Sequence, residues 1–427
     1  MSKKINFIVL VAMVLLVLVN GTAYELNPNT DSIDTGDTAW MLVASAFVLL
    51  MTPGLAFFYG GMVNKKNVIS TMLQSFVALG VISVLWIVVG FSLAFGESIG
   101  GIIGNPLTYF CFSGVTSSPN PDFSETIPFL LFALFQLKFA IITPALITGS
   151  FAERIKFRSY ILFMVLFSIF IYAPLAHMTW HPEGLFRNWG VLDFAGGTVV
   201  HMSAGFAALA GAVFLGKRKE VSHDPANVPF IILGTGLLWF GWFGFNAGSA
   251  LGANVDAVIA FANTNLASAA AMITWIFYDR FMGRKMSAIG ACIGAIVGLV
   301  AITPAAGFVT IGQSIFIGAA AAVISNVAIT VKNRSKLDDT LDVFPSHGLG
   351  GVVGMVLTGV FANEVGLIHG ETTTFLFHML ALVIVAVFTF GGSWLLYFLV
   401  NLIIPVRVQE KHEASGLDLS QHGEQFA

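Results

Sequence analysis

"GGTVVHMSAG", residues 196–205, places a histidine within an apolar run that extends from Val191 to Leu215. A run of this length can cross a lipid bilayer as a single helix. An ionisable side chain is costly at that depth, and it usually faces a partner or a pathway rather than lipid. The surroundings of His201 are therefore expected to show what this membrane helix does.

The rest of the chain has the same apolar character. Of its 427 residues, 56% are hydrophobic and only 10% are charged, whereas soluble proteins carry about 25% charged residues. A membrane β-barrel would show short alternating segments instead of long apolar blocks. We therefore expect an all-α polytopic membrane protein. The net charge of −3 offers no basic surface for nucleic acid, and Cys111 and Cys292 lack the spacing of a disulfide framework or a zinc site.

The N-terminus has the pattern of a secretory signal peptide. Lys3 and Lys4 precede the apolar run 5–19, and small residues at 20–23 offer a cleavage site. The alternative is an uncleaved first helix. We expect cleavage of residues 1–23, a membrane domain over residues 24–404 and a cytoplasmic tail over residues 405–427.

Eleven apolar blocks follow, each long enough to span the bilayer. They lie near residues 38–62, 69–95, 126–150, 160–180, 193–215, 228–250, 256–278, 286–304, 312–331, 343–361 and 373–404. Sixteen of the 20 Lys and Arg residues fall on alternate connections, after the odd-numbered blocks. Positively charged loops stay in the cytoplasm, so the N-terminus is expected outside and the C-terminus inside, in the cell (inner) membrane.

An odd number of spans in each half predicts an inverted 5+5 helix repeat followed by an eleventh helix. The fifth span opens with Asp193 and carries His201 eight residues later. The tenth opens with Asp342 and carries His347 five residues later. Each span thus has an acid at its start, then glycines, then one histidine, and the two histidines are expected to meet near the midplane.

Such a histidine pair has two interpretations. It can line a narrow pore, where it relays protons or accepts a hydrogen bond from a small polar solute. It can also be a pair of ordinary hydrogen bonds between helices. The matching positions in the two halves favour the pathway. Asp193 is expected to be a helix N-cap, and it can also be a buried carboxylate that stabilises an incoming cation.

Aromatic residues gather on neighbouring spans. They are Trp242 and Phe245 with Ser249 on one face of the sixth span, Phe135 and Phe139 in the third, and Trp180 at the end of the fourth. Aromatic residues at a membrane interface are usually belt anchors. Aromatic faces also attract cations, and a hydroxyl oxygen accepts a hydrogen bond from an N–H group. Together these residues indicate a site for a small ammonium-like ion.

Six stretches resemble the ammonium transporter (Amt/Mep/Rh) family, on its Amt branch. They are "DTAWMLVASAFVLLMTPGLAFFYGGMVNKKN" (37–67), "FAIITPALITGSFAERIKF" (139–157), "DFAGGTVVH" (193–201), "FGWFGFNAGS" (240–249), "DVFPSHGLGGVVG" (342–354) and "GLDLSQHGE" (416–424). They occur in order and cover nearly all of the chain after the expected signal peptide.

The resemblance implies a role for each matching residue. It implies an outer NH4+ recruitment site at Trp180, Phe139 and Ser249, where Asp193 holds and deprotonates the cation. Beneath this site it implies a gate of Phe139 and Phe245 beside Phe135. Below the gate it implies a pore lined by the twin histidines His201 and His347, with Trp242 beside them. It also implies a homotrimer with one pore per subunit, a PII-type signalling partner at the cytoplasmic face, no cofactor and no enzymatic activity. Transport would be net NH4+, with NH3 and H+ moving separately and electrogenically; a current-free NH3 channel is the competing version.

Two other function classes remain as alternatives. An ammonium sensor would signal through its tail and conduct little, and it could lose the twin histidines and phenylalanine gate that this chain retains. A membrane metalloenzyme would use His201 and His347 as ligands, but the sequence has neither an H-x-x-x-H pair nor an acidic cluster to complete a metal site.

Three features do not follow from the resemblance. Lys138 adjoins Phe139 within the third span, where it could extend to the membrane surface or face another subunit, and it would repel a cation if it pointed into the vestibule. The loop 181–192 carries His181 and Arg187 near the recruitment tryptophan. The polar tail 405–427 is either a disordered end or the regulatory segment that the resemblance implies.

Overall fold

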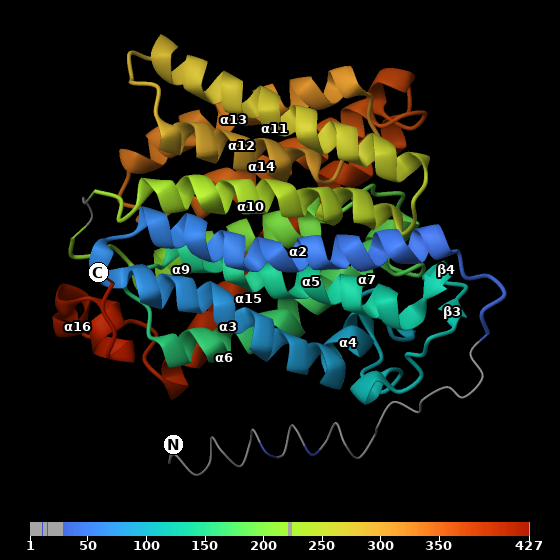
Figure 1. The fold of residues 1–427 in the computed structure, drawn as a ribbon, viewed down its shortest axis with the longest axis horizontal. Coiled ribbons are helices and arrows are strands. Elements are labelled where there is room, and N and C mark those ends of the chain that lie inside the picture. The colour runs from blue at the N-terminus through green and yellow to red at the C-terminus, as the bar shows by residue number, and fades with distance from the viewer. Residues whose placement is uncertain (1–10, 12–14, 16–28, 221–223, 427) are drawn as a thin grey trace.

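The computed structural model describes residues 29–220 and 224–426, together with Val11 and Leu15. The expected signal peptide and its cleavage site thus lie almost wholly outside the described residues. Within the described residues, ten helices are long and apolar enough to span a membrane, and a further apolar helix is shorter. Figure 1 shows them as a bundle of roughly aligned helices.

The spans follow the eleven predicted blocks closely, and several are built from consecutive helical pieces. The bundle contains α2 (Thr35–Met62), α3 (Val68–Leu85), η2 (Trp86–Gly90), α4 (Phe91–Phe95), α5 (Phe129–Ile147), α6 (Phe157–Phe167), η5 (Ser168–Tyr172), α7 (Ala173–Trp180), η6 (Gly197–Met202), α9 (Ser203–Leu215), α10 (Val228–Ala247), α11 (Val255–Phe281), α12 (Ala288–Ile302), α13 (Ile311–Asn333), η8 (Phe344–Gly348), α14 (Leu349–Phe361) and α15 (Thr372–Ile403).

The remaining elements lie at the two ends of the bundle. Between the spans are η1 (Lys65–Asn67), β1 (Ser98–Ile99), β2 (Ile103–Gly104), η3 (Phe110–Phe112), β3 (Pro119–Asn120), β4 (Ser124–Pro128), η4 (Thr148–Ser150), α8 (Leu185–Asn188), η7 (Gly248–Ala250) and η9 (Leu367–His369), and after the last span come α16 (Glu410–Ser415) and η10 (Asp418–His422). The antiparallel pairs β1–β2 and β3–β4 mark one end, here named the hairpin face. The segments α16 and η10 mark the opposite end, here named the tail face (Figure 1).

The eighth predicted span is the short one. Helix α12 has 15 residues, Ala288–Ile302, which gives a length of about 22 Å at 1.5 Å per residue. That length is less than the roughly 30 Å of a hydrocarbon core. Because Val297, Leu299, Val300 and Ile302 are completely buried, α12 lies inside the bundle rather than against lipid.

The fifth and tenth spans cross each other closely. They run antiparallel, and each opens with a wide, π-type helical turn: η6 holds His201 and η8 holds His347. A Cβ added at Gly205 would lie 2.2 Å from the backbone of Gly348. The contacts are reciprocal, since α9 packs against η8 and α14 packs against η6. The glycines of both spans therefore permit the backbones to meet where the histidines lie.

Asp342 directly precedes the helix of the tenth span, as predicted. Asp342 forms an ion pair with Lys332. The backbone N–H of Phe344 donates instead to Asp339 Oδ2, at 2.7 Å. Asp342 has a positive φ of 58°. The sequence places both acids within five residues of the helix start, and spacing alone does not distinguish them.

Candidate functional site

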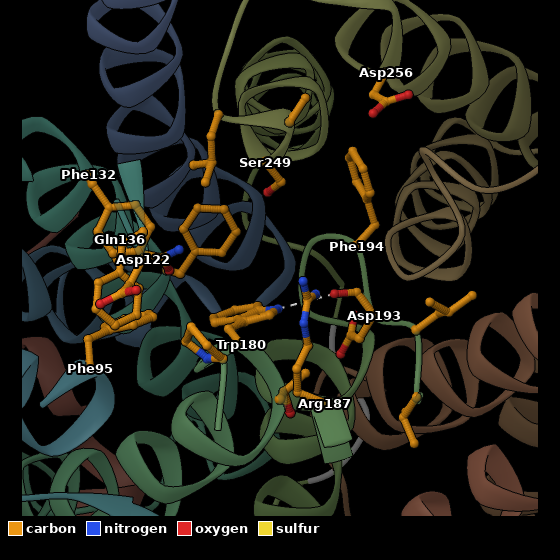
Figure 2. Close-up of a pocket in the computed structure, with 18 of the residues that line it drawn as sticks. Phe95, Asp122, Phe132, Gln136, Trp180, Arg187, Asp193, Phe194, Ser249 and Asp256 are labelled. Atoms are coloured by element: carbon orange, nitrogen blue, oxygen red, sulfur yellow. Dashed lines mark hydrogen bonds between the residues drawn. The ribbon is translucent and has the colours of Figure 1, made fainter. Parts of the chain in front are cut away.

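A cavity of about 320 Å³ opens at the hairpin face. Its lining includes all four residues expected to recruit a cation, namely Trp180, Phe139, Ser249 and Asp193. Trp180 ends α7, Phe139 lies in the middle of α5, and Ser249 belongs to η7, directly after α10. Asp193 lies in the loop before η6. Figure 2 shows Trp180, Ser249 and Asp193 around this space, with the aspartate beside the tryptophan.

Asp193 has the capping geometry that the sequence predicts. Its Oδ1 accepts from the N–H groups of Gly196 and Gly197 at 2.8 and 2.6 Å. Its Oδ2 accepts from the N–H and hydroxyl of Thr198 at 2.8 and 2.5 Å. Gly196 has a φ of 111°, which permits this tight turn. The side chain is 7% exposed, and its four hydrogen bonds fix the carboxyl group at the wall of the cavity.

Trp180 is fixed by the same loop. Its Nε1–H donates to the backbone carbonyl of Asp193 at 3.1 Å. Its ring meets the edge of the Phe139 ring, with centroids 5.9 Å apart and planes at 82°. Ser249 donates its hydroxyl hydrogen to the Phe245 carbonyl at 2.9 Å, so its oxygen retains an acceptor position on the cavity side.

Phe139 lines the cavity and packs against Phe245. The rings of Phe139 and Phe245 lie with centroids 4.2 Å apart and planes tilted by 31°, and both side chains are buried. Phe135 meets Phe139 edge-on at 5.0 Å and does not line the cavity. The three rings expected to form the gate thus lie together, with Phe139 in contact with both Phe245 and Phe135.

His201 and His347 meet beneath this pair of rings. Their Nδ1 atoms are 3.3 Å apart, and the side chains are 1% and 4% exposed. His201 Nε2 has no hydrogen-bond partner among the described residues. His347 also lines a small cavity on the tail side, together with Tyr59 and Leu341. The predicted meeting of the two histidines is thus present in the structure.

Trp242 flanks the histidines. Its ring stacks on His201 with centroids 5.2 Å apart and planes at 21°. Its Nε1–H donates to Thr303 Oγ1 at 2.9 Å, so it faces away from the histidine nitrogens. The stacked tryptophan thus packs against the face of the His201 ring, while His201 Nδ1 remains in contact with His347.

Four polar residues of the site were missed by sequence reasoning. His378 Nε2 accepts from the N–H of Leu192 at 2.9 Å, which holds the Asp193 loop in place. Thr303 anchors Trp242, and Gln136 and Thr179 line the cavity. Isolated polar residues near apolar runs usually satisfy packing contacts, so no pattern in the sequence distinguished these four from structural residues.

Lys138 and Arg187, the two basic residues to which the resemblance assigns no role, lie in different environments. Lys138 is half-buried, and it does not line the cavity. Arg187 is exposed and lines the cavity mouth, where Figure 2 places it next to Trp180 and Asp193. Arg187, and not Lys138, is thus the cation that lines the cavity.

The tail face is closed by ordered polar contacts. Asp418 accepts from the N–H groups of Ile69 and Ser70 at 3.1 and 2.7 Å, which caps helix α3. The Leu417 N–H donates to Asn67 Oδ1 at 2.8 Å. Over residues 405–426 the tail is therefore docked on the bundle, and the alternative of a disordered end is wrong for this part of the chain.

A buried ion cluster lies beside the docked tail. Arg218 binds Asp338 through Nε at 2.9 Å and Glu153 through Nη1 at 2.8 Å. Burial raises the pKa of Asp338, but hydrogen bonds from Arg218 and the charge of Arg154 outweigh it and bring the pKa below its usual value. Burial and the neighbouring Asp342 raise the pKa of Asp339 to about 6. The loops of the tail face are thus held by charge pairs.

Comparisons with known proteins agree in sequence and in structure. The family model described as Ammonium Transporter Family matches residues 39–426. An ammonium transporter from Aquifex aeolicus is 48% identical over 399 residues, covering 92% of this chain and 93% of the relative. Solved Mep2 of Saccharomyces cerevisiae superposes with a TM-score of 0.83 at 34% identity, covering 89% of each chain. A solved structure described as a sensor Amt protein superposes with a TM-score of 0.82 at 29% identity, covering 91% of this chain and 98% of the other. The chain belongs to the ammonium transporter family.

Proposed function

We propose that this chain recruits NH4+ at the hairpin face, deprotonates it and passes NH3 along the twin histidines, while H+ crosses separately. The observation that carries this is the buried His201–His347 contact, Nδ1 to Nδ1 3.3 Å, directly beneath a cavity of aromatic rings, a serine and an aspartate. Aromatic faces and hydroxyl oxygens suit a cation that carries N–H donors.

The phenylalanine rings below the cavity determine whether NH4+, NH3 or K+ can pass toward the histidines. NH4+ would lose its hydration in passing between the Phe139 and Phe245 rings, and a bare charge in an apolar site is costly. Dissociation into NH3 and H+ removes that cost, because neutral NH3 both donates to and accepts from imidazole nitrogens. K+ has no proton to lose, so the same rings exclude it.

Asp193 acts through its charge. All its hydrogen bonds are with its own turn, at Gly196, Gly197 and Thr198. This geometry favours stabilising the cation electrostatically over accepting its proton directly. The proton then moves through water or along the histidine pair. Because H+ and NH3 both cross the membrane, transport carries a net positive charge and is electrogenic.

The surrounding assembly is part of the same proposal. The strand pairs face outside, the docked tail faces the cytoplasm, and the N-terminus lies outside after removal of residues 1–23 as a signal peptide in the cell (inner) membrane. Spans one to five and six to ten form an inverted repeat within the domain of residues 24–404. Three copies associate in the lipid bilayer, and the cytoplasmic tail, residues 405–427, and the loops bind a PII-type signalling protein.

The experiment is a current measurement on proteoliposomes given a pulse of NH4+ or of K+. Transport predicts a transient current with NH4+ and none with K+. A second candidate is a sensor that binds ammonium and conducts little, which the likeness to a sensor Amt protein favours. Ammonium binding without current would support the sensor, and internal alkalinisation without current would support a neutral NH3 channel.

A further inference from the structure

A second cavity, of about 440 Å³, adjoins the first at the hairpin face. Four residues line both, namely Phe95, Asp122, Phe123 and Pro182. Asp122 and Phe123 belong to the turn of the β3–β4 pair, so this turn forms the wall between the two spaces. A solute that reaches the second cavity thus has Asp122 between it and the recruitment residues.

Three carboxylates line the second cavity. Glu97, Asp122 and Glu183 are exposed. Within the described residues none of their side chains accepts a hydrogen bond or forms an ion pair, whereas Glu153, Asp338 and Glu413 at the tail face form ion pairs. Unpaired carboxylates that converge on one space raise the local concentration of cations.

Two buried polar groups lie farther in, on the side of the first cavity. The side chains of Gln136 and Thr179 line that cavity and are 9% and 2% exposed. Gln136 Oε1 and Thr179 Oγ1 have no hydrogen-bond partner among the described residues. Buried polar atoms are nearly always satisfied, so oxygens without a partner beside a cavity point to a ligand with N–H or O–H donors.

Aromatic rings complete this inner space. Phe132 lies 5.1 Å from Phe95 and 5.6 Å from Phe123, centroid to centroid. Figure 2 shows Asp122, Gln136, Phe95 and Phe132 together on one side of Trp180, with Arg187 on the other. The positive charge therefore lies away from this group, and the negative charge lies over it.

We propose that Asp122, Gln136 and Thr179, with the Phe95, Phe123 and Phe132 rings, form a second binding subsite for small ammonium cations. The ion reaches it through the acidic second cavity and passes from it to Trp180 and Ser249. This subsite rests on the transport function proposed above, and it assigns the route by which the cation approaches.

The chemistry sets the size of the expected effects. A hydrogen bond to a charged group contributes about 1.5–3 kcal/mol, and 1.4 kcal/mol is about tenfold in affinity. An exposed charge contributes about 0–1 kcal/mol. Loss of the Thr179 hydroxyl is therefore expected to weaken binding about tenfold, and loss of the Asp122 charge about threefold.

The test measures initial current against ammonium concentration in proteoliposomes. Asp122→Asn and Thr179→Val are compared with the wild type, and both are expected to raise the half-saturating concentration while the maximal current is unchanged. Added inert salt should abolish the Asp122→Asn effect and preserve that of Thr179→Val. Two controls are matched: Glu125→Gln removes an exposed charge from the same loop outside both cavities, and Thr179→Ser keeps the hydroxyl.

The outcomes separate the subsite from the transport function. Unchanged half-saturation in both variants, an equal shift in Glu125→Gln, or a loss of maximal current alone would overturn the subsite while a conducting wild type upheld transport. A wild type with no current would overturn both proposals. Rescue by Thr179→Ser together with the salt-sensitive Asp122→Asn shift would support the subsite.

Discussion

The role of a buried polar residue in this protein depends on the side chains and backbone groups that it contacts. His201 stacks on Trp242 and meets His347, whereas His378, equally buried, holds the backbone of Leu192. In the sequence each is one histidine in an apolar run. The twin histidines were predictable because two spans share a pattern, and His378 was not, because no second element repeats its context.

Arg187 gives a prediction at this scale. Its guanidinium lines the cavity mouth and forms no ion pair among the described residues. Arg187→Ala should lower the half-saturating ammonium concentration by up to about fivefold at low salt, since an exposed charge contributes about 0–1 kcal/mol. Salt near 1 M should remove the difference, because it screens charges beyond about 3 Å.

The matched control for Arg187 is Arg280→Ala, which removes an exposed charge from the end of α11, outside the cavity. Half-saturation should not change in that variant. An unchanged or higher half-saturating concentration in Arg187→Ala would contradict a repulsive role for this residue.

The sequence predicts the positions of the helices better than the local geometry within them. The eleven blocks predicted where helices lie, because apolar length alone determines that. The π-type turns at η6 and η8, and the hydrogen bond from the Phe344 N–H to Asp339, arise from local backbone choices. Periodicity averages over such turns, so it could not have located them.

The crossing of the fifth and tenth spans can be tested at Gly205. A Cβ there would lie 2.2 Å from the Gly348 backbone, so Gly205→Ala must push the spans apart. We expect a loss of about 1–3 kcal/mol in stability and a lower melting temperature in detergent. Gly236→Ala is the control, because a Cβ at Gly236 meets nothing within 4 Å; equal melting temperatures for the two variants would contradict the close crossing.

The start of the tenth span should respond to pH. The pKa of Asp339 is raised to about 6, above about 3.9 in an unfolded chain, so the folded state binds the extra proton between these values. Stability from this group is therefore greatest below about pH 4 and decreases as pH rises to about 6.

Asp339→Asn tests this titration by removing the charge while keeping an oxygen acceptor for the Phe344 N–H. Between pH 4 and 6 the melting temperature of the wild type should decrease more steeply with pH than that of the variant. Parallel curves for the two proteins would show that Asp339 does not titrate in this range.

At the scale of the whole molecule, the sequence predicted the membrane bundle and the alternation of charged loops, and the structure added the docking of the tail. That docking depends on Asn67, Ile69 and Ser70, which lie almost 350 positions away in the chain. A polar tail of ordinary composition gives no sign of such distant partners, so only the family resemblance suggested a specific role for it.

Tail docking depends on Asp418, which is 1% exposed and caps α3. Asp418→Ala removes two charge-assisted hydrogen bonds, and loss of a helix cap costs about 0.5–2 kcal/mol. Limited proteolysis should then cut the tail about tenfold faster, because cleavage follows the population of the open state. Glu424→Ala, an exposed change in the same segment, should leave the rate unchanged, and equal rates for both variants would contradict the capping role.

The central claim is that the buried histidine pair makes the pathway selective for ammonium. The most direct test is the solid-supported membrane current of proteoliposomes carrying His201→Ala with His347→Ala, given NH4+ or K+ pulses. The control is His369→Ala, an exposed histidine away from the cavity. We predict an ammonium current with K+ silent in the wild type and the control, and in the double variant either no current or a current that K+ also carries. A double variant that still conducts ammonium and excludes K+ would contradict the account.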